Sequence, residues 1–219
     1  MSTGTNGQNP WSELGELPER VNMAGFLTER AAEAPNMPAI RVAKTVGKTT
    51  QFDDISFAQL DRESGVIASG LAALGLKRGM RASLFVKPGV ELIAITFALL
   101  KLGAVPVLID PGMGPKNVLR CVAKMKPEAF IGIPAAHVLR RLFPSSFRTV
   151  SINVVATGKG SRALSLLTGA PTLAKTKQGH APLPACDAHR DDEAAILFTS
   201  GSTGPPQRCH LYPRDVRSP

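Results

Sequence analysis

The chain has 219 residues, of which 43% are hydrophobic and 20% are charged, a balance that excludes a disordered protein and indicates an ordinary globular domain. Its net charge of +9 is concentrated in residues 157–190, with five basic side chains against one acidic, and in residues 207–219, with three against one. Because the chain has one Trp, one Tyr and no basic stripe interleaved with aromatic residues, we interpret these segments as solvated basic surface and do not expect nucleic-acid binding.

Cysteine usage predicts the compartment in which the protein works. Three cysteines, Cys121, Cys186 and Cys209, are widely spaced and odd in number, which is typical of a reducing compartment such as the cytoplasm and not of a disulfide framework. His189 and His210 lie close to two of them, but no C-x-x-C spacing supports a zinc site. We therefore expect no metal ligands in this chain.

The sequence has no pattern typical of a signal peptide or a membrane span. Residues 1–20 lack the basic start and the apolar core of a signal peptide, and we expect them to be flexible. The most apolar stretch, residues 90–109, is broken by Glu91, Lys101 and Gly103, whereas a span needs about 20 uninterrupted apolar residues. The pattern favours a buried helix followed by a buried strand.

The first strong element along the chain is a helix over residues 56–75. Ser56 followed by Gln59 forms a capping box, in which each side chain binds a backbone N–H that the first helical turn leaves unpaired. Apolar residues then recur at the helical period, and Gly75 ends the helix. The short apolar run RASLFV that follows predicts a buried strand.

Helices and strands continue to alternate beyond this point. The patterns predict a helix over residues 90–103, a strand over 104–110, a helix opened by Pro115, a strand over 129–133, a short helix over 134–143 and a strand over 147–155. Strands that alternate with helices of this length form a parallel sheet with helices on both faces. The predicted fold class is therefore α/β, with a parallel sheet.

Residues 157–190 interrupt this alternation. The segment is rich in Gly, Pro, Lys and Ser and is longer than most loops of compact domains. We expect either a mobile crossover or a poorly ordered loop excursion, which could contain a short helix over residues 163–173. We assign it no function.

The alternation resumes with a strand over residues 194–198, followed by a run of small hydroxylated residues and glycines. The run comprises Thr199, Ser200, Gly201, Ser202, Thr203 and Gly204. Ligands of open α/β sheets bind at the carboxyl ends of strands, where glycines let the backbone approach a polyphosphate and hydroxyls add donors. On these residues alone a flexible Gly/Ser/Thr loop remains an alternative, since the run fits neither the P-loop nor the dinucleotide-binding pattern.

The stretch ILFTSGSTGPP resembles the phosphate-binding loop of the adenylate-forming superfamily, whose usual form is T-S-G-S/T-T-G-x-P-K-G. This superfamily includes acyl-CoA synthetases, luciferases and the adenylation domains of nonribosomal peptide synthetases. Three further stretches resemble successive N-terminal segments of the family in its order and spacing: NMAGFLTERAAEAPNMPAI, ISFAQLDRESGVIASGLAALGLKRGMRASLFV and ELIAITFALLKLGAVPVLIDP. The likeness covers residues 21–206, and LIDPGMGPKNVLRCV most resembles the branch of fatty-acid CoA ligase-like enzymes that contains olefin β-lactone synthetases.

The resemblance implies an ATP-dependent ligase that works in two steps. The carboxylate of a fatty acid or a 3-hydroxy fatty acid attacks the α-phosphate of ATP bound with Mg²⁺, and pyrophosphate leaves. The CoA thiol or the substrate's own 3-hydroxyl then displaces AMP. Residues 199–204 would hold the β- and γ-phosphates through preorganised donors. The resemblance implies no nucleophile or general base among the residues of this chain.

The sequence departs from the family pattern after Pro206. Gln207 and Arg208 stand where the family has Lys and Gly, and residues 207–219 then resemble nothing in the family. The family's adenine, ribose and Mg²⁺ ligands and its C-terminal domain should follow this point, so the resemblance implies an N-terminal portion truncated after the phosphate-binding loop. We expect an inactive fragment with an unpaired sheet edge and an exposed apolar face, which favour aggregation. A non-catalytic fragment that binds phosphate or another protein is the alternative function.

Overall fold

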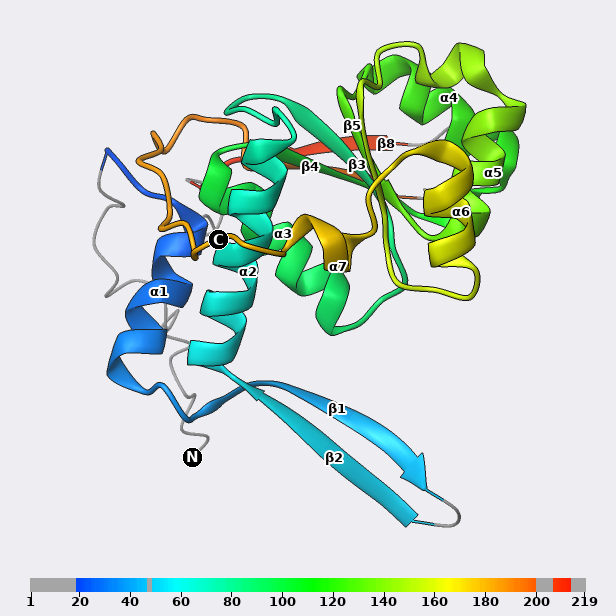
Figure 1. Cartoon of the computed structure of the whole chain (residues 1–219). Coiled ribbons are helices and arrows are strands. Elements are labelled where there is room, and N and C mark those ends of the chain that lie inside the picture. Colours follow the sequence, from blue (N-terminus) through cyan, green and yellow to red (C-terminus); the bar gives the residue numbers. More distant parts are fainter. Residues whose placement is uncertain (1–18, 47–48, 200–206, 214–219) are drawn as a thin grey trace, which may run out of the picture.

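The computed structural model describes residues 19–46, 49–199 and 207–213, and its centre is a six-stranded sheet (Figure 1). The strands are β3 (Arg81–Phe85), β4 (Val105–Ile109), β5 (Ala129–Gly132), β6 (Ile152–Val155), β7 (Ala195–Thr199) and β8 (Gln207–Leu211). Their order in the sheet is β6-β5-β3-β4-β7-β8. All neighbours pair in parallel except β8, which pairs antiparallel with β7. The predicted α/β class with a parallel sheet is confirmed.

Helices cover both faces of the sheet (Figure 1), and a separate apolar core lies between the sheet and the helices of each face. The longer helices are α1 (Met23–Glu33), α2 (Phe57–Ala73), α3 (Val90–Leu102), α4 (Pro115–Met125) and α5 (Pro134–Leu142). The core under α1, α2 and α3 includes Leu71, Ile95 and Ile131, and the core under α4 and α5 includes Val122 and Phe130. In the described ranges no helix is both long enough and apolar enough to cross a membrane.

The residues that were predicted to begin or end helices do so in the structure. The Gln59 amide donates to Ser56 Oγ over 3.2 Å and the Ser56 amide donates to Gln59 Oε1 over 2.9 Å, which completes the capping box of α2. Gly103 ends α3 in the left-handed region, at φ 68°, where a side chain would be strained. Pro115 opens α4.

The predicted strand over residues 147–155 is shorter than expected. Only residues 152–155 form β6, and a 3₁₀ turn, η2 (Pro144–Phe147), precedes it. Phe147 is buried beneath α4 and packs edge-to-face on Phe130, with 5.3 Å between ring centres. This tertiary contact outweighs the β-branched pattern of the sequence. Burial of an aromatic ring contributes more to the free energy of folding than the strand propensity of a few residues does.

A two-stranded antiparallel arm, β1 (Pro38–Val46) and β2 (Thr49–Ser56), projects from the body beside α2 (Figure 1). Arg41 on β1 donates to both carboxylate oxygens of Asp54 on β2, over 2.8 and 2.9 Å. The sequence reasoning did not predict this arm. The signal was present, because β-branched residues flank Gly47 and Lys48 on both sides.

The segment over residues 157–190 contains two short helices, α6 (Ser161–Thr168) and α7 (Leu173–Thr176). After α7 it runs along α2 and α3, because the Leu183 amide donates to the Gly65 carbonyl over 3.0 Å and the Cys186 amide donates to the Lys101 carbonyl over 2.8 Å. The expected excursion is therefore packed against the helices of one face. Glycine and proline content alone did not reveal these contacts.

Candidate functional site

The predicted phosphate-binding run begins at the carboxyl edge of the sheet. Thr199 is the last residue of β7, and the neighbouring strand β4 ends at the same level, where the Asp110 amide donates to the Phe198 carbonyl over 3.4 Å. The other members of the run, Ser200, Gly201, Ser202, Thr203 and Gly204, lie outside the described residues. The predicted position of the run at a strand's carboxyl end is therefore observed for its first residue.

The chain returns to the same place in the sheet at Gln207, three residues after the run. Gln207 begins β8 and pairs with Thr199 in the antiparallel register, so both ends of the intervening stretch meet at one point of the sheet edge. The strand β8 was not predicted from the sequence, from which we expected an unpaired sheet edge instead. In the structure β7 pairs with β4 on one side and with β8 on the other, so β8 forms this edge of the sheet.

Three helices begin at this edge of the sheet without a side-chain cap. The helices α3, α4 and α5 follow the carboxyl ends of β3, β4 and β5, and their N-cap residues, Gly89, Gly114 and Ile133, make no side-chain capping hydrogen bond. The first turns of α4 and α5 also contain no acidic residue. Since the amino end of a helix carries a partial positive charge, this edge favours anions.

The acidic side chains near this edge that the structure describes take part in local hydrogen bonds. Asp110 accepts a hydrogen bond from the Gly112 amide over 2.8 Å and caps the turn η1 (Pro111–Met113). Glu91, in the first turn of α3, accepts one from the Thr157 amide over 2.8 Å. Within the described ranges, no group of three or more His, Cys, Asp or Glu side chains could hold a metal ion. The amino ends of these helices thus make this edge favourable for an anion.

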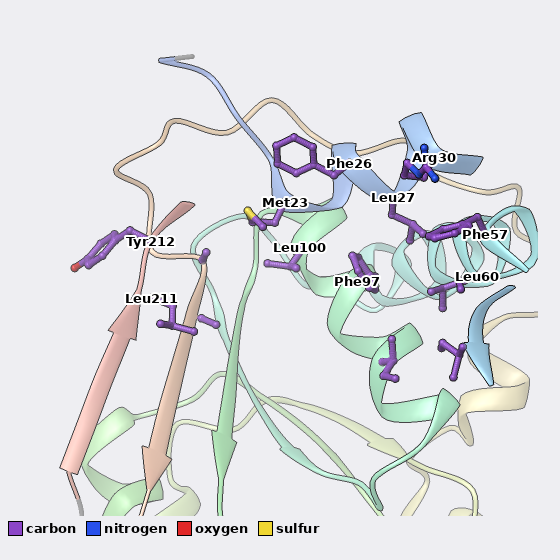
Figure 2. A pocket seen from close by; sticks show the side chains of 15 residues that line it. Met23, Phe26, Leu27, Arg30, Phe57, Leu60, Phe97, Leu100, Leu211 and Tyr212 are labelled. Carbon is purple, nitrogen blue, oxygen red and sulfur yellow. The ribbon is translucent and has the colours of Figure 1, made fainter. Parts of the chain in front are cut away.

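A separate apolar groove of about 550 Å³ lies at the opposite end of β7 (Figure 2). Its walls come from α1, α2 and α3 on one side and from the start of β7 and the end of β8 on the other. The one charged side chain among its described lining residues, Arg30, pairs with Glu33 over 2.8 Å and lies over the Phe57 ring. The groove is an exposed apolar surface, and the exposed apolar face of the sheet expected from the sequence stays a prediction.

We expect the purified chain to bind an apolar dye such as 8-anilinonaphthalene-1-sulfonate saturably in this groove. Phe26→Asp places a charge on the groove wall and should reduce the fluorescence enhancement severalfold, because burying an unpaired carboxylate is unfavourable. Phe52→Asp is the control, since Phe52 is exposed on β2 outside the groove. Equal dye binding by the two variants would place the dye elsewhere.

A family model described as "AMP-binding enzyme" matches residues 27–216, most of the chain. The chain belongs to the AMP-binding enzyme family. The chain is 40% identical over 201 residues to an olefin beta-lactone synthetase of Xanthomonas campestris, covering 88% of this chain and 34% of that protein. It is 42% identical over 193 residues to an olefin beta-lactone synthetase of Stenotrophomonas maltophilia, covering 85% of this chain and 34% of that protein. The chain spans about a third of the length of these relatives.

Solved structures of adenylate-forming enzymes share the fold of this chain. An anthranilate CoA ligase in complex with anthranoyl-AMP matches with a TM-score of 0.75 at 20% identity, covering 91% of this chain and 36% of that one. A long-chain-fatty-acid-CoA ligase of Archaeoglobus fulgidus matches with a TM-score of 0.74 at 16% identity, covering 92% and 39%. At these identities the likeness establishes the fold alone. This fold is the one predicted from the sequence, the N-terminal portion of the adenylate-forming enzyme fold.

Proposed function

We propose that the chain supplies the triphosphate-binding part of an ATP-dependent acyl-activating ligase. The observation that carries this proposal is the place of Thr199, the first residue of the run, at the carboxyl end of β7 and on the sheet edge where α3, α4 and α5 begin. Backbone amides and hydroxyls of this run would bind the β- and γ-phosphates of ATP and stabilise the charge on departing pyrophosphate. ATP, used with Mg²⁺, would supply the adenylyl group that activates the carboxylate.

The substrate that we propose is a fatty acid or a 3-hydroxy fatty acid. Support comes from the two olefin beta-lactone synthetases and from a long-chain-fatty-acid CoA ligase of Mycobacterium tuberculosis, 28% identical over 188 residues, 85% of this chain and 34% of that protein. The second step would be transfer of the acyl group to CoA or closure of a β-lactone by the 3-hydroxyl. A reducing cytoplasmic setting fits the three free cysteines, Cys121, Cys186 and Cys209.

Binding of ATP by residues 199–204 can be tested directly. Ser202→Asp should weaken ATP binding about tenfold or more in isothermal titration, because a carboxylate inside the loop repels phosphate. Ser145→Asp is the matched control, since it makes the same charge change at an exposed position of η2. If both variants bind ATP as tightly as the parent chain, the loop does not hold the phosphates.

The second candidate function is a non-catalytic fragment that binds phosphate or associates with another protein. The exposed apolar groove favours it, because large exposed apolar surfaces are typical of interaction sites. Exchange of labelled pyrophosphate into ATP, driven by fatty acids or 3-hydroxy fatty acids, separates the two. We expect these 219 residues alone to bind ATP without catalysing exchange, and measurable exchange would instead assign them the complete adenylation step.

A further inference from the structure

The helices α5 and α6 combine exposed leucines with positive charge at one end of the molecule. Figure 1 shows the two helices together, away from α1. A Cβ added at Gly158, three residues before α6, would lie 3.0 Å from Cδ of Pro134, the first residue of α5. Towards the other ends of the helices, Arg140 and Thr168 line one small cavity. The two helices therefore lie next to each other and point in the same direction.

The apolar side chains of these two helices are unusually exposed. Leu166 and Leu167, consecutive residues of α6, are 87% and 81% exposed. On α5, Val138 and Leu142 are exposed, and so is Phe143 at its C-cap. Single exposed apolar residues are ordinary, whereas five on two adjacent helices form a cluster of the kind that marks interaction sites.

The helix α6 gains little stability from packing on its own chain. It spans eight residues, and none of them is buried. Helices of this length are marginal in water, because most helical stability in proteins comes from burial of an apolar face. The apolar side chains of Leu166 and Leu167 instead face solvent. A surface that covers these two leucines would supply the missing burial.

Positive charge accompanies the exposed leucines. Residues 129–186 contain seven Lys and Arg and no Asp or Glu, so this part of the chain has a charge of +7 against +9 for the whole. Five of the seven are exposed, and none of these five has an ion-pair partner in the described part of the chain. They are Arg141, Arg148, Lys159, Arg162 and Lys175. Arg162 lies four residues before Leu166, so the two side chains share one face of α6.

A lipid bilayer with anionic headgroups matches both features of these helices. Its phosphate groups attract Lys and Arg, and the acyl chains beneath them accept apolar side chains. A nucleic acid would pair with the charges and leave the leucines in water, because its phosphate backbone offers them no apolar surface. The combination of leucines and unpaired charge thus favours the lipid surface.

We propose that the α5–α6 surface docks this protein on an anionic lipid bilayer. The surface comprises Arg141, Leu142, Lys159, Arg162, Leu166 and Leu167. Leu166 and Leu167 enter the boundary between headgroups and acyl chains, and the basic side chains stay among the headgroups. The proposal is independent of the nucleotide function proposed above, since the α5–α6 surface shares no residue with the 199–204 run.

The test is cosedimentation of the full chain with vesicles of phosphatidylcholine that contain about 30% phosphatidylglycerol. We expect saturable binding that falls severalfold when the salt concentration rises from about 0.1 to 0.5 M, because salt screens exposed charges. Vesicles of phosphatidylcholine alone should bind the chain about tenfold more weakly or less. The proposal is overturned if the anionic vesicles show no saturable binding, or if both kinds of vesicle bind equally.

Replacement of both exposed leucines, Leu166→Ser with Leu167→Ser, should weaken binding to the anionic vesicles about tenfold or more, because their burial among acyl chains is lost. The matched control is Phe26→Ser with Phe52→Ser, which removes two exposed apolar side chains elsewhere, one of them in the groove near α1. It should bind as tightly as the parent chain. An unchanged affinity of the leucine variant would indicate a purely electrostatic surface, suited to a nucleic acid, and would overturn the proposal.

The charges can be tested in the same assay. Arg162→Gln should weaken binding to the anionic vesicles about fivefold, as expected for one basic side chain at a lipid surface. Arg62→Gln is the matched control, since it makes the same change at an exposed position of α2, outside the α5–α6 surface. Equal losses for the two variants would contradict the place of contact.

Insertion of α6 can be followed by fluorescence after Trp11→Phe has removed the one native Trp. The emission of Leu167→Trp should shift to shorter wavelength when anionic vesicles are added, because the indole leaves water. The emission of Phe52→Trp, on the arm, should stay unchanged. An unshifted spectrum of Leu167→Trp would contradict insertion of α6.

Discussion

Asp61→Ala is expected to destabilise the protein by about 3–5 kcal/mol, as removal of one partner from a buried ion pair does. Lys101, on α3, is 1% exposed, and its ammonium donates to Asp61 Oδ1 and to the Asp61 carbonyl, each over 2.8 Å. Thr28 Oγ1, on α1, also donates to Asp61 Oδ1 over 2.8 Å, so one carboxylate joins three helices. Without it, the ammonium stays buried with only the main-chain acceptor. Urea unfolding followed by circular dichroism measures the loss.

Two comparisons distinguish the contribution of the ion pair to stability from the effect of substituting any residue of the helix. The carboxylate is 24% exposed, so water can reach it, and Lys101→Met should cost less than Asp61→Ala. The double variant should recover much of the stability that Asp61→Ala loses. Glu63→Ala is the matched control on α2, because its pair with Lys177 is partly exposed and such pairs contribute about 0–1 kcal/mol. Equal losses for Asp61→Ala and Glu63→Ala would contradict the role of burial.

Gly70→Ala is the second substitution with a large expected effect. A Cβ at this position of α2 would lie 1.9 Å from the Thr176 carbonyl oxygen and 2.8 Å from its carbonyl carbon. Both atoms belong to the backbone of α7, so the two helices would have to separate. Overpacking typically costs about 1–3 kcal/mol and occasionally more, and we expect a loss at or above the top of that range. The midpoint of urea unfolding measures it.

Gly25→Ala provides the opposite control. Gly25 lies in α1, and no heavy atom would lie within 4 Å of an added Cβ. The substitution should therefore stabilise the chain by about 0.5–1 kcal/mol through the loss of backbone freedom in the unfolded state. If both glycine substitutions destabilised the chain equally, close packing of α7 on α2 would not be the cause.

The sequence predicted the central elements of the fold because their signals are local. The capping box at Ser56, the glycine that ends α3 and the proline that opens α4 each act within one or two helical turns. Contacts between distant residues were not predictable in this way. Lys101 was interpreted only as an interruption of an apolar stretch, since its partner Asp61 is 40 residues away in the sequence.

The candidate site was predicted in part. The carboxyl end of β7 could be assigned from a strand followed by Gly, Ser and Thr. Its place beside β4 was not predicted, because a parallel sheet does not by itself fix the order of its strands. The strand β8 was missed, because residues 207–211 lack the alternating pattern of a strand and resembled no known segment.

The antiparallel pairing of β8 has a kinetic consequence for whatever binds between the two strands. An outermost strand opens more readily than an interior one, and β7 stays held by β4 when β8 detaches. For the phosphate binding proposed above, the apparent affinity would then fall in proportion to the fraction of time that β8 is detached. Residues of β8 that never touch the phosphate would therefore influence how tightly it is held.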